Sequence, residues 1–132
     1  MGTLSGFLLD THTLLWAKSE PDKLSSRVHA TASDPANAVY VSAASAYEIA
    51  LKNRTGKLPG VEALVAGFPA VVVASGFQLL DITARHAITA GRLDLGHKDP
   101  FDRLLIAQAL VEDLTLLSNE RRFDSFGVRR LW

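Results

Sequence analysis

The chain has 132 residues, of which 48 % are hydrophobic and 21 % charged, which suits one domain with a sizeable core. Its 14 basic and 14 acidic residues balance to a formal net charge of zero, so the overall charge does not indicate a nucleic-acid partner. The absence of cysteine excludes disulfides, zinc–thiolate sites and thiol catalysis. We expect one domain over residues 1–132, in the cytoplasm and outside the membrane, because no signal segment is visible and the apolar run 70–74 is too short to cross a bilayer.

A short apolar strand followed directly by an acid opens the predicted elements. Residues 6–10 indicate a buried strand ending at Asp10, and Thr11 to Ala17 indicate the start of a helix. A short helix over 24–32 and a turn at 34–37 are expected next. Asp10 is therefore either a helix cap or part of a binding site, because ligands gather at the carboxyl ends of parallel strands.

A second strand and helix repeat this arrangement. Residues 39–42 predict the strand, and the helix runs from about Ala43 to Thr55 with Gly56 closing it. Ser45-x-x-Glu48 matches a capping box, whereas the alternative is a site carboxylate in a helix that follows a strand. The bases beyond Glu48 indicate either a solvated face or a phosphate-binding patch: Lys52, Arg54 and Lys57.

The middle of the chain has weaker signals. Residues 61–76 are mostly apolar and are expected to be helical at first, despite Gly67 and Pro69. Residues 77–81 predict a third strand, and residues 83–93 predict a helix with Thr83 as its cap.

The most informative stretch is the helix that begins near Pro100. Pro100 suits the first helical position, which places Asp99 at the N-cap and Asp102 at the third helical position. Residues three apart share a helix face, so the two carboxylates can point the same way. Almost no polar face follows them, so we expect a buried helix with only its acidic end in solvent. The alternative to half of a metal site is a plain, well-capped helix.

The C-terminal part completes the alternation of strands and helices. Residues 114–118 predict a strand, 119–124 a short turn or helix, and 127–132 a last strand at the edge of the sheet. This order predicts an α/β fold, a three-layer α/β/α sandwich with a mainly parallel central sheet.

Acids occupy the same kind of position in four separate segments. Each lies just after a strand or at the start of a helix, and so at one edge of a parallel sheet: Asp10, Glu48, Asp99 with Asp102, and Glu120. Clustered carboxylates repel one another, so they either raise their pKa values or hold a cation. Carboxylate oxygens suit Mg²⁺ or Mn²⁺, and such sites carry out metal-assisted phosphodiester hydrolysis.

Four motifs, spread in order over nearly the whole chain, resemble a PIN-domain protein. They are Leu8-Leu9-Asp10-Thr11-His12, Ser45-Ala46-Tyr47-Glu48-Ile49, the block 99–109 (DPFDRLLIAQA) and the closing segment 116–123 (LLSNERRF). The block 99–109 is the most specific of them. More narrowly, the chain is similar to a VapC-type toxin of a bacterial or archaeal toxin–antitoxin pair.

The resemblance implies an endoribonuclease that depends on Mg²⁺ or Mn²⁺ and hydrolyses phosphodiester bonds in RNA. Asp10, Glu48 and Asp99 match the acidic core of the family, and Asp102 matches the second acid of its central block, so these four are the expected catalytic and metal-binding residues. Glu120 stands where many members carry Asp, and it is expected to bind metal directly or through a water. Asp124 is the alternative fourth acid.

Other residues near these acids have two interpretations each. Substrate-binding candidates are Thr11, Ser118 and Arg103, whose structural alternatives are the first turn of a helix, a turn cap and an ion pair at a helix start. His12 and His97, each two positions from a site acid, contact substrate or shuttle protons. His29 and His86 are expected to be surface or structural residues. Basic side chains near the C-terminus bind RNA or an acidic partner segment, or are simply solvated: Arg121, Arg122, Arg129 and Arg130.

The resemblance also implies a cognate antitoxin and a homodimer, with the apolar residues 14–16 and 61–73 as candidate contacts unless core packing explains them. Two other functions compete. One is a non-catalytic RNA-binding or scaffold domain on the same fold. The other is a Mg²⁺-dependent phosphatase or response-regulator-like domain, which would require a second acid at the position of His12. A dinucleotide-binding fold is disfavoured because no Gly-x-Gly-x-x-Gly follows a strand.

Overall fold

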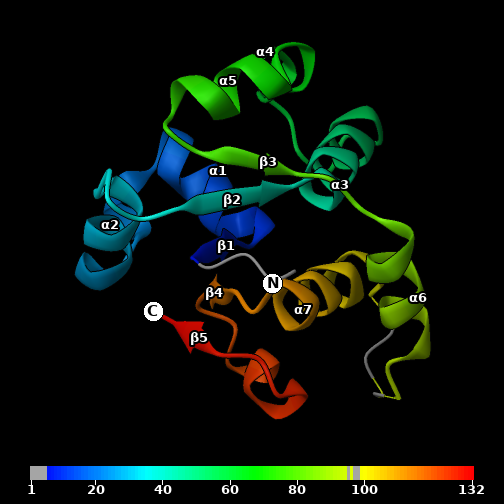
Figure 1. Cartoon of the computed structure of the whole chain (residues 1–132). Helices are drawn as coiled ribbons and strands as arrows, with labels where there is room; N and C mark the ends of the chain where they lie inside the picture. The colour runs from blue at the N-terminus through cyan, green and yellow to red at the C-terminus, as the bar shows by residue number, and fades with distance from the viewer. Residues whose placement is uncertain (1–5, 95, 97–98) are drawn as a thin grey trace.

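The computed structural model describes residues 6–94, 96 and 99–132, which form one parallel sheet with helices on both faces (Figure 1). The strands are β1 (Phe7–Leu9), β2 (Val39–Ser42), β3 (Gln78–Leu80), β4 (Thr115–Leu117) and β5 (Arg130–Leu131). They lie in the order β3-β2-β1-β4-β5, and every described pair is parallel. The predicted α/β class is confirmed, and the sheet is parallel throughout rather than mainly so.

Helical segments connect these strands, as parallel pairing requires. They are α1 (Thr11–Ser19), η1 (Pro21–Lys23), α2 (Ser26–Ser33), α3 (Ala43–Arg54), α4 (Glu62–Ala66), α5 (Phe68–Ala74), α6 (Ala84–Arg92), α7 (Pro100–Glu112) and η2 (Arg121–Phe126). No helix in the described part of the chain is long and apolar enough to span a membrane.

Alternate residues of the strands face two separate cores. Leu8 and Leu116 pack with Ile106 of α7 on one face, whereas Leu9 and Leu117 pack with residues of α1, α2, α3 and α5 on the other. This period of two buries both faces of short strands, which explains their continuous apolar character. The result is the predicted three-layer sandwich, with β1 at the centre of the sheet.

The helix caps follow the sequence with one exception. Asp10, Ser25, Thr83 and Asp99 are N-caps whose side chains accept backbone N–H bonds, as their positions predict. Helix α3, however, is capped by Ser42. Residues 61–76 form two short helices that break at Gly67, rather than one.

Helix α7 is less completely buried than its composition predicts. Residues 105–109 are buried, but Leu110 on the next turn is 40 % exposed. Helix α7 packs on the sheet and against α6, which leaves part of its surface in solvent. Some apolar residues of α7, such as Leu110, therefore lie outside the core.

A buried glutamine ties α7 to the ends of two strands. The Ser42 hydroxyl donates to Oε1 of Gln108 over 2.5 Å, and Nε2 of Gln108 donates to the carbonyl of Asp81 over 3.3 Å. Because Ser42 ends β2 and Asp81 follows β3, these bonds hold α7 at the carboxyl edge of the sheet. The acidic N-terminus of α7 is thereby fixed relative to that edge.

Candidate active site

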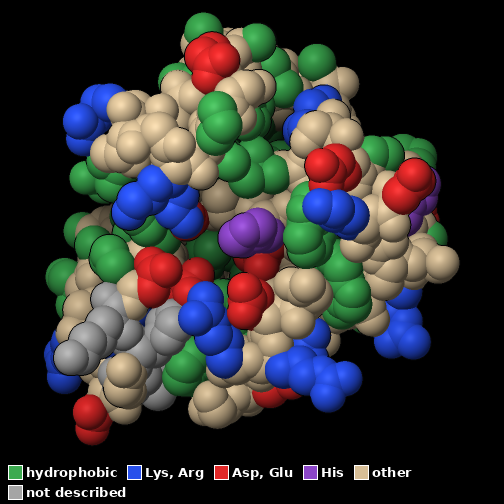
Figure 2. All heavy atoms as spheres, turned by 180° about the vertical axis from the view of Figure 1, so that it is seen from behind, with side chains coloured by type: hydrophobic (Ala, Val, Ile, Leu, Met, Phe, Trp, Pro, Cys, Tyr) green, Lys and Arg blue, Asp and Glu red, His purple; other side chains and the backbone are tan. Residues whose placement is uncertain are grey.

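Five carboxylates from four separate segments line a pocket of about 80 Å³ at the carboxyl ends of the strands. They are the five acids that the sequence selected: Asp10, Glu48, Asp99, Asp102 and Glu120. Thr11, His12, Lys52 and Arg122 complete the lining. On the face shown in Figure 2, acidic side chains gather near the centre with lysine and arginine side chains beside them. The structure thus brings together residues that are far apart in the sequence.

Asp10 is both a helix cap and a buried site acid. Its Oδ1 accepts the backbone N–H of Thr13 over 2.8 Å, and only 5 % of the residue is exposed. Burial raises the pKa of the Asp10 carboxyl, while hydrogen bonds from Ser118 and Thr13 act in the opposite direction. Burial therefore disfavours the charged form of Asp10, and a proton or a nearby cation offsets that cost.

Glu48 points from α3 into the same pocket and has no capping role. Because α3 begins at Ala43, Glu48 lies inside the helix, and the alternative of a Ser45–Glu48 capping box is wrong. Its Oε1 accepts the Thr11 hydroxyl over 2.7 Å, and the Ser45 hydroxyl lies 2.9 Å from that of Thr11. Its Oε2 accepts from Lys52 over 2.6 Å. Thr11, the first residue of α1, therefore orients Glu48 through its hydroxyl.

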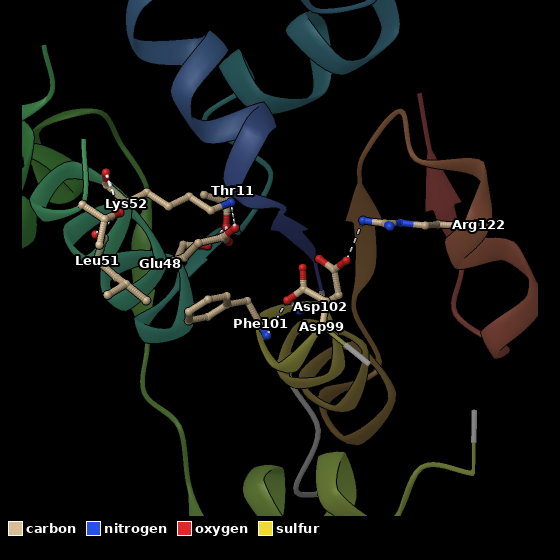
Figure 3. Close-up of polar contacts among 10 residues, drawn as sticks. Thr11, Glu48, Leu51, Lys52, Asp99, Phe101, Asp102 and Arg122 are labelled. Atoms are coloured by element: carbon tan, nitrogen blue, oxygen red, sulfur yellow. Dashed lines mark hydrogen bonds and ion pairs between the residues drawn. The ribbon is translucent and has the colours of Figure 1, made fainter. Parts of the chain in front are cut away.

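The acids of α7 lie across the pocket from Glu48 (Figure 3). Oδ1 of Asp99 accepts the backbone N–H groups of Phe101 and Asp102, over 2.9 Å and 3.4 Å. Asp102 accepts from the guanidinium of Arg122 over 2.7 Å. Asp99, like Asp10, caps its helix with one carboxylate oxygen and also lines the pocket.

The fourth acidic segment contributes Glu120. Its carboxylate lies 3.4 Å from Nε of Arg122 and lines the pocket. Asp124 instead pairs with Arg130, over 2.8 Å and 3.0 Å, and this pairing lowers the pKa of Asp124. The alternative in which Asp124 replaces Glu120 finds no support, because Asp124 is absent from the pocket lining.

Of the three predicted substrate-binding residues, Thr11 lines the pocket, whereas Ser118 and Arg103 do not. Ser118 is fully buried, and its hydroxyl oxygen accepts the backbone N–H of Glu120 over 3.0 Å, so it caps the turn behind the pocket. Arg103 donates to the carbonyls of Ala90 and Leu93, over 3.1 Å and 2.6 Å, at the C-terminal end of α6. These bonds hold Arg103 against the C-terminal end of α6, and the pocket lining does not include it.

The histidines follow the same division. His12 is exposed and lines the pocket, whereas His97 lies outside the described residues. His86 is buried in the α6 cap and its Nε2 lies 3.2 Å from Glu112, which confirms a structural role.

Sequence reasoning did not single out an aromatic pair beside the acids. The rings of Tyr47 and Phe101 meet edge to face, with centroids 5.4 Å apart, and Tyr47 is 64 % exposed. Tyr47 precedes Glu48, and Phe101 lies between Asp99 and Asp102. That adjacency to site acids was the available signal, although only the fold shows that the two rings touch.

The donor chemistry of the pocket fits a hard divalent cation, although the side chains are not collected around one point. Within the described residues, no group of three His, Asp or Glu side chains stands ready to hold a metal ion. Two of the carboxylates, Glu48 and Asp102, are instead engaged by Lys52 and Arg122. Oxygen donors of this kind suit Mg²⁺ and Mn²⁺ once these side chains turn toward the ion.

Comparison with family models places this site in a known context, because the model of the PIN domain matches residues 7–128. The chain belongs to the PIN-domain family. PIN domains are generally nucleases and typically use a divalent metal. A search of curated proteins finds no significant match.

Solved structures share the PIN-domain fold at low sequence identity. VapBC2 from Rickettsia felis, bound to a DNA fragment from its promoter, has a chain 19 % identical, with a TM-score of 0.69 over 95 % of this chain and 96 % of that one. DNA-bound VapBC from Salmonella typhimurium gives 20 % identity and a TM-score of 0.65, covering 97 % and 98 %. FitAcB from Neisseria gonorrhoeae gives 18 % and 0.64, covering 96 % of each chain.

Proposed function

We propose that this PIN domain is a Mg²⁺- or Mn²⁺-dependent endoribonuclease that acts as the toxin of a toxin–antitoxin pair in the cytoplasm. The observation that carries the proposal is the pocket itself, in which carboxylates from four separate segments meet at the carboxyl edge of the sheet. All acids expected of the family core are present, which disfavours a non-catalytic RNA-binding or scaffold domain.

Asp10, Glu48, Asp99 and Asp102 would hold the metal, with Glu120 as a further ligand. When bound, the ion activates a water and stabilises the leaving oxygen of the phosphodiester. The chain's own part is to fix these acids. Helix N-termini orient Asp10 and Asp99 through backbone N–H bonds, and the Thr11 hydroxyl orients Glu48. Such restraint reduces the entropy lost when ligands collect around an ion.

One structural feature supports RNA as the substrate, and the fold comparison supports a protein partner. The exposed ring of Tyr47, braced by Phe101, offers a stacking surface for an unpaired base next to the acids. The chain is also similar in fold to proteins solved as VapBC and FitAB complexes, which supports a cognate antitoxin; a homodimer is part of the proposal on the family resemblance alone. Of the apolar candidate contacts, Leu14, Phe68 and Val72 are buried in the core, whereas the side chain of Val73 is exposed and others are partly buried.

Cleavage of labelled total tRNA and rRNA by the purified, antitoxin-free chain tests the proposal. We expect discrete cuts with Mg²⁺ or Mn²⁺, none with chelator, and a rate at least about 100-fold lower in Asp99→Asn, the order lost when one group that stabilises developing charge is removed. Asparagine keeps the N-cap of α7, so the loss reports charge rather than folding. Asp124→Asn is the matched control, because Asp124 lies outside the pocket lining.

If the folded chain binds RNA without cutting it under any metal, the non-catalytic alternative replaces the nuclease. If neither cutting nor binding occurs, Glu120→Asp restores the acid that many members of the family carry at this position. Cleavage gained by that variant would show that the longer side chain weakens the site, and the wild-type protein would then not be the proposed nuclease.

A further inference from the structure

Two basic side chains reach into the acidic pocket from opposite sides (Figure 3). Lys52 extends from α3, one turn beyond Glu48, and its Nζ lies 2.6 Å from Oε2 of that carboxylate. Arg122 extends from η2, and its guanidinium lies 2.7 Å from Oδ2 of Asp102 and 3.4 Å from Glu120. The chain therefore supplies its own cations to three of the five site acids.

The exposure of these pairs is unequal in an informative way. The carboxylate side chains of Glu48 and Asp102 are 8 % and 13 % exposed, whereas those of Lys52 and Arg122 are 39 % and 49 % exposed. The acids are thus fixed inside the pocket, while the bases lie along its rim. Long, partly solvated Lys and Arg side chains can turn their charged ends toward a new partner without leaving water.

A divalent ion and these two bases require the same carboxylate oxygens. Five carboxylates against two cations leave the pocket negative, so it repels RNA phosphates in the absence of a metal. If an ion takes Glu48 and Asp102, the ammonium of Lys52 loses its carboxylate and the guanidinium of Arg122 keeps Glu120, at the rim of a pocket that has become less negative. A guanidinium then matches a phosphate with two parallel hydrogen bonds, and an ammonium matches it as a point charge.

We propose that Lys52 and Arg122 exchange partners. They neutralise Glu48 and Asp102 in the metal-free protein, and they bind backbone phosphates of the RNA on the two sides of the cleaved bond once these acids hold metal. The inference rests on the proposed function and assigns the substrate-binding groups of that site. It also explains why no ready-made group of metal ligands is present among the described residues.

The exchange predicts opposite effects on the two ligands. In Lys52→Gln and in Arg122→Gln, Mn²⁺ binding measured by isothermal titration calorimetry is expected to become about two- to fivefold tighter, because a competitor for carboxylate oxygen is removed. Binding of a short labelled single-stranded RNA, measured by fluorescence anisotropy with Ca²⁺ in place of Mg²⁺, is expected to weaken several-fold. The salt dependence of that binding should decrease by about one ion per variant.

Matched controls separate this exchange from a general loss of charge. Lys23→Gln and Arg27→Gln each remove a positive charge outside the pocket lining, and both ligand affinities should stay close to wild type. Lys52→Arg keeps a cation on a long stem and should recover RNA binding. Circular dichroism and a denaturation curve establish that each variant is folded.

Weaker Mn²⁺ binding in Lys52→Gln and Arg122→Gln would overturn the exchange, because the bases would then only hold the acids in place for the ion. Unchanged RNA affinity would overturn the phosphate role. A wild-type chain that binds neither Mn²⁺ nor RNA would instead remove the proposed function itself. The wild-type titrations therefore distinguish the two failures before any variant is compared.

Discussion

Replacing Asp10 by asparagine is expected to make the metal-free protein more stable and at the same time to abolish its response to metal. Asparagine is as good an N-cap as aspartate, so the bond from the Thr13 N–H to the side chain is retained. What disappears is a negative charge that burial destabilises. The variant therefore separates the structural role of this side chain from its role in the site.

The stability difference between Asp10→Asn and the wild type should depend on pH in a defined direction. Because the pKa of Asp10 in the folded protein is raised above its ordinary value of 3.8, the folded state binds this proton more tightly than the unfolded state. The contribution of Asp10 to wild-type stability therefore falls as the pH rises from about 3.8 to the folded-state pKa, and the penalty stays constant above it. The stability advantage of Asp10→Asn should vanish below pH 3.8 and reach its full size at neutral pH.

Thermal unfolding with and without Mn²⁺ measures both effects. At a free metal concentration of about 100 times Kd, the wild type gains about 2.7 kcal/mol, whereas Asp10→Asn should gain much less. Asp10→Ala provides the comparison, because it loses the cap as well and should fall below Asp10→Asn by about 1 kcal/mol without metal. An Asp10→Asn protein that is stabilised by Mn²⁺ as strongly as wild type would remove Asp10 from the set of ligands.

The second large effect is expected from Gly6→Ala. Gly6 precedes β1 with φ at +129°, a conformation that residues with a side chain rarely adopt. A Cβ at this position would lie 2.3 Å from the carbonyl oxygen of Ala38, which accepts the N–H of Phe7. Because the obstacle is backbone, strain and steric overlap together should lower the free energy of unfolding by about 2–4 kcal/mol.

The same substitution elsewhere should have the opposite sign. Gly91 lies inside α6, and a Cβ built there meets nothing within 4 Å. Gly91→Ala should therefore raise stability by about 0.5–1 kcal/mol through better helix propensity. Urea denaturation measures the free energy of unfolding of both variants, provided that its dependence on urea concentration has the same slope as in the wild type. A Gly6→Ala protein as stable as wild type would show that the start of β1 can move away from β2.

Short sequence patterns predict most of the strands and helices and all the acids of the site. A strand followed by an acid, and a proline behind an aspartate, fix Asp10 and Asp99 through interactions within three residues, and both side chains cap as expected. Sequence alone left two roles open at these positions, and the structure shows that each aspartate caps a helix and lines the pocket. Local geometry cannot decide such a case, because one oxygen is enough for the cap.

Non-local contacts set the limit of the prediction. The pairing of Lys52 with Glu48 lies within one helical spacing, so the sequence permits it. The pairing of Arg122 with Asp102 depends on how η2 returns over α7, which no local pattern encodes. Arg103 illustrates the same point, because its direction toward α6 follows from the packing of two helices rather than from its neighbours in the chain.

The position of β1 between β2 and β4 has a consequence for synthesis on the ribosome. Leu9 pairs with Val41, which is synthesised soon after it, but its partner on the other side is Leu117, so one edge of β1 stays unpaired until β4 has emerged. Glu120 and Arg122 follow directly after that last partner. A nascent chain thus has time to fold its first helices while its acidic pocket is still incomplete, and a long-range pairing of this kind forms slowly. The order of the strands therefore delays assembly of the acidic pocket until the segment that follows β4 has emerged from the ribosome.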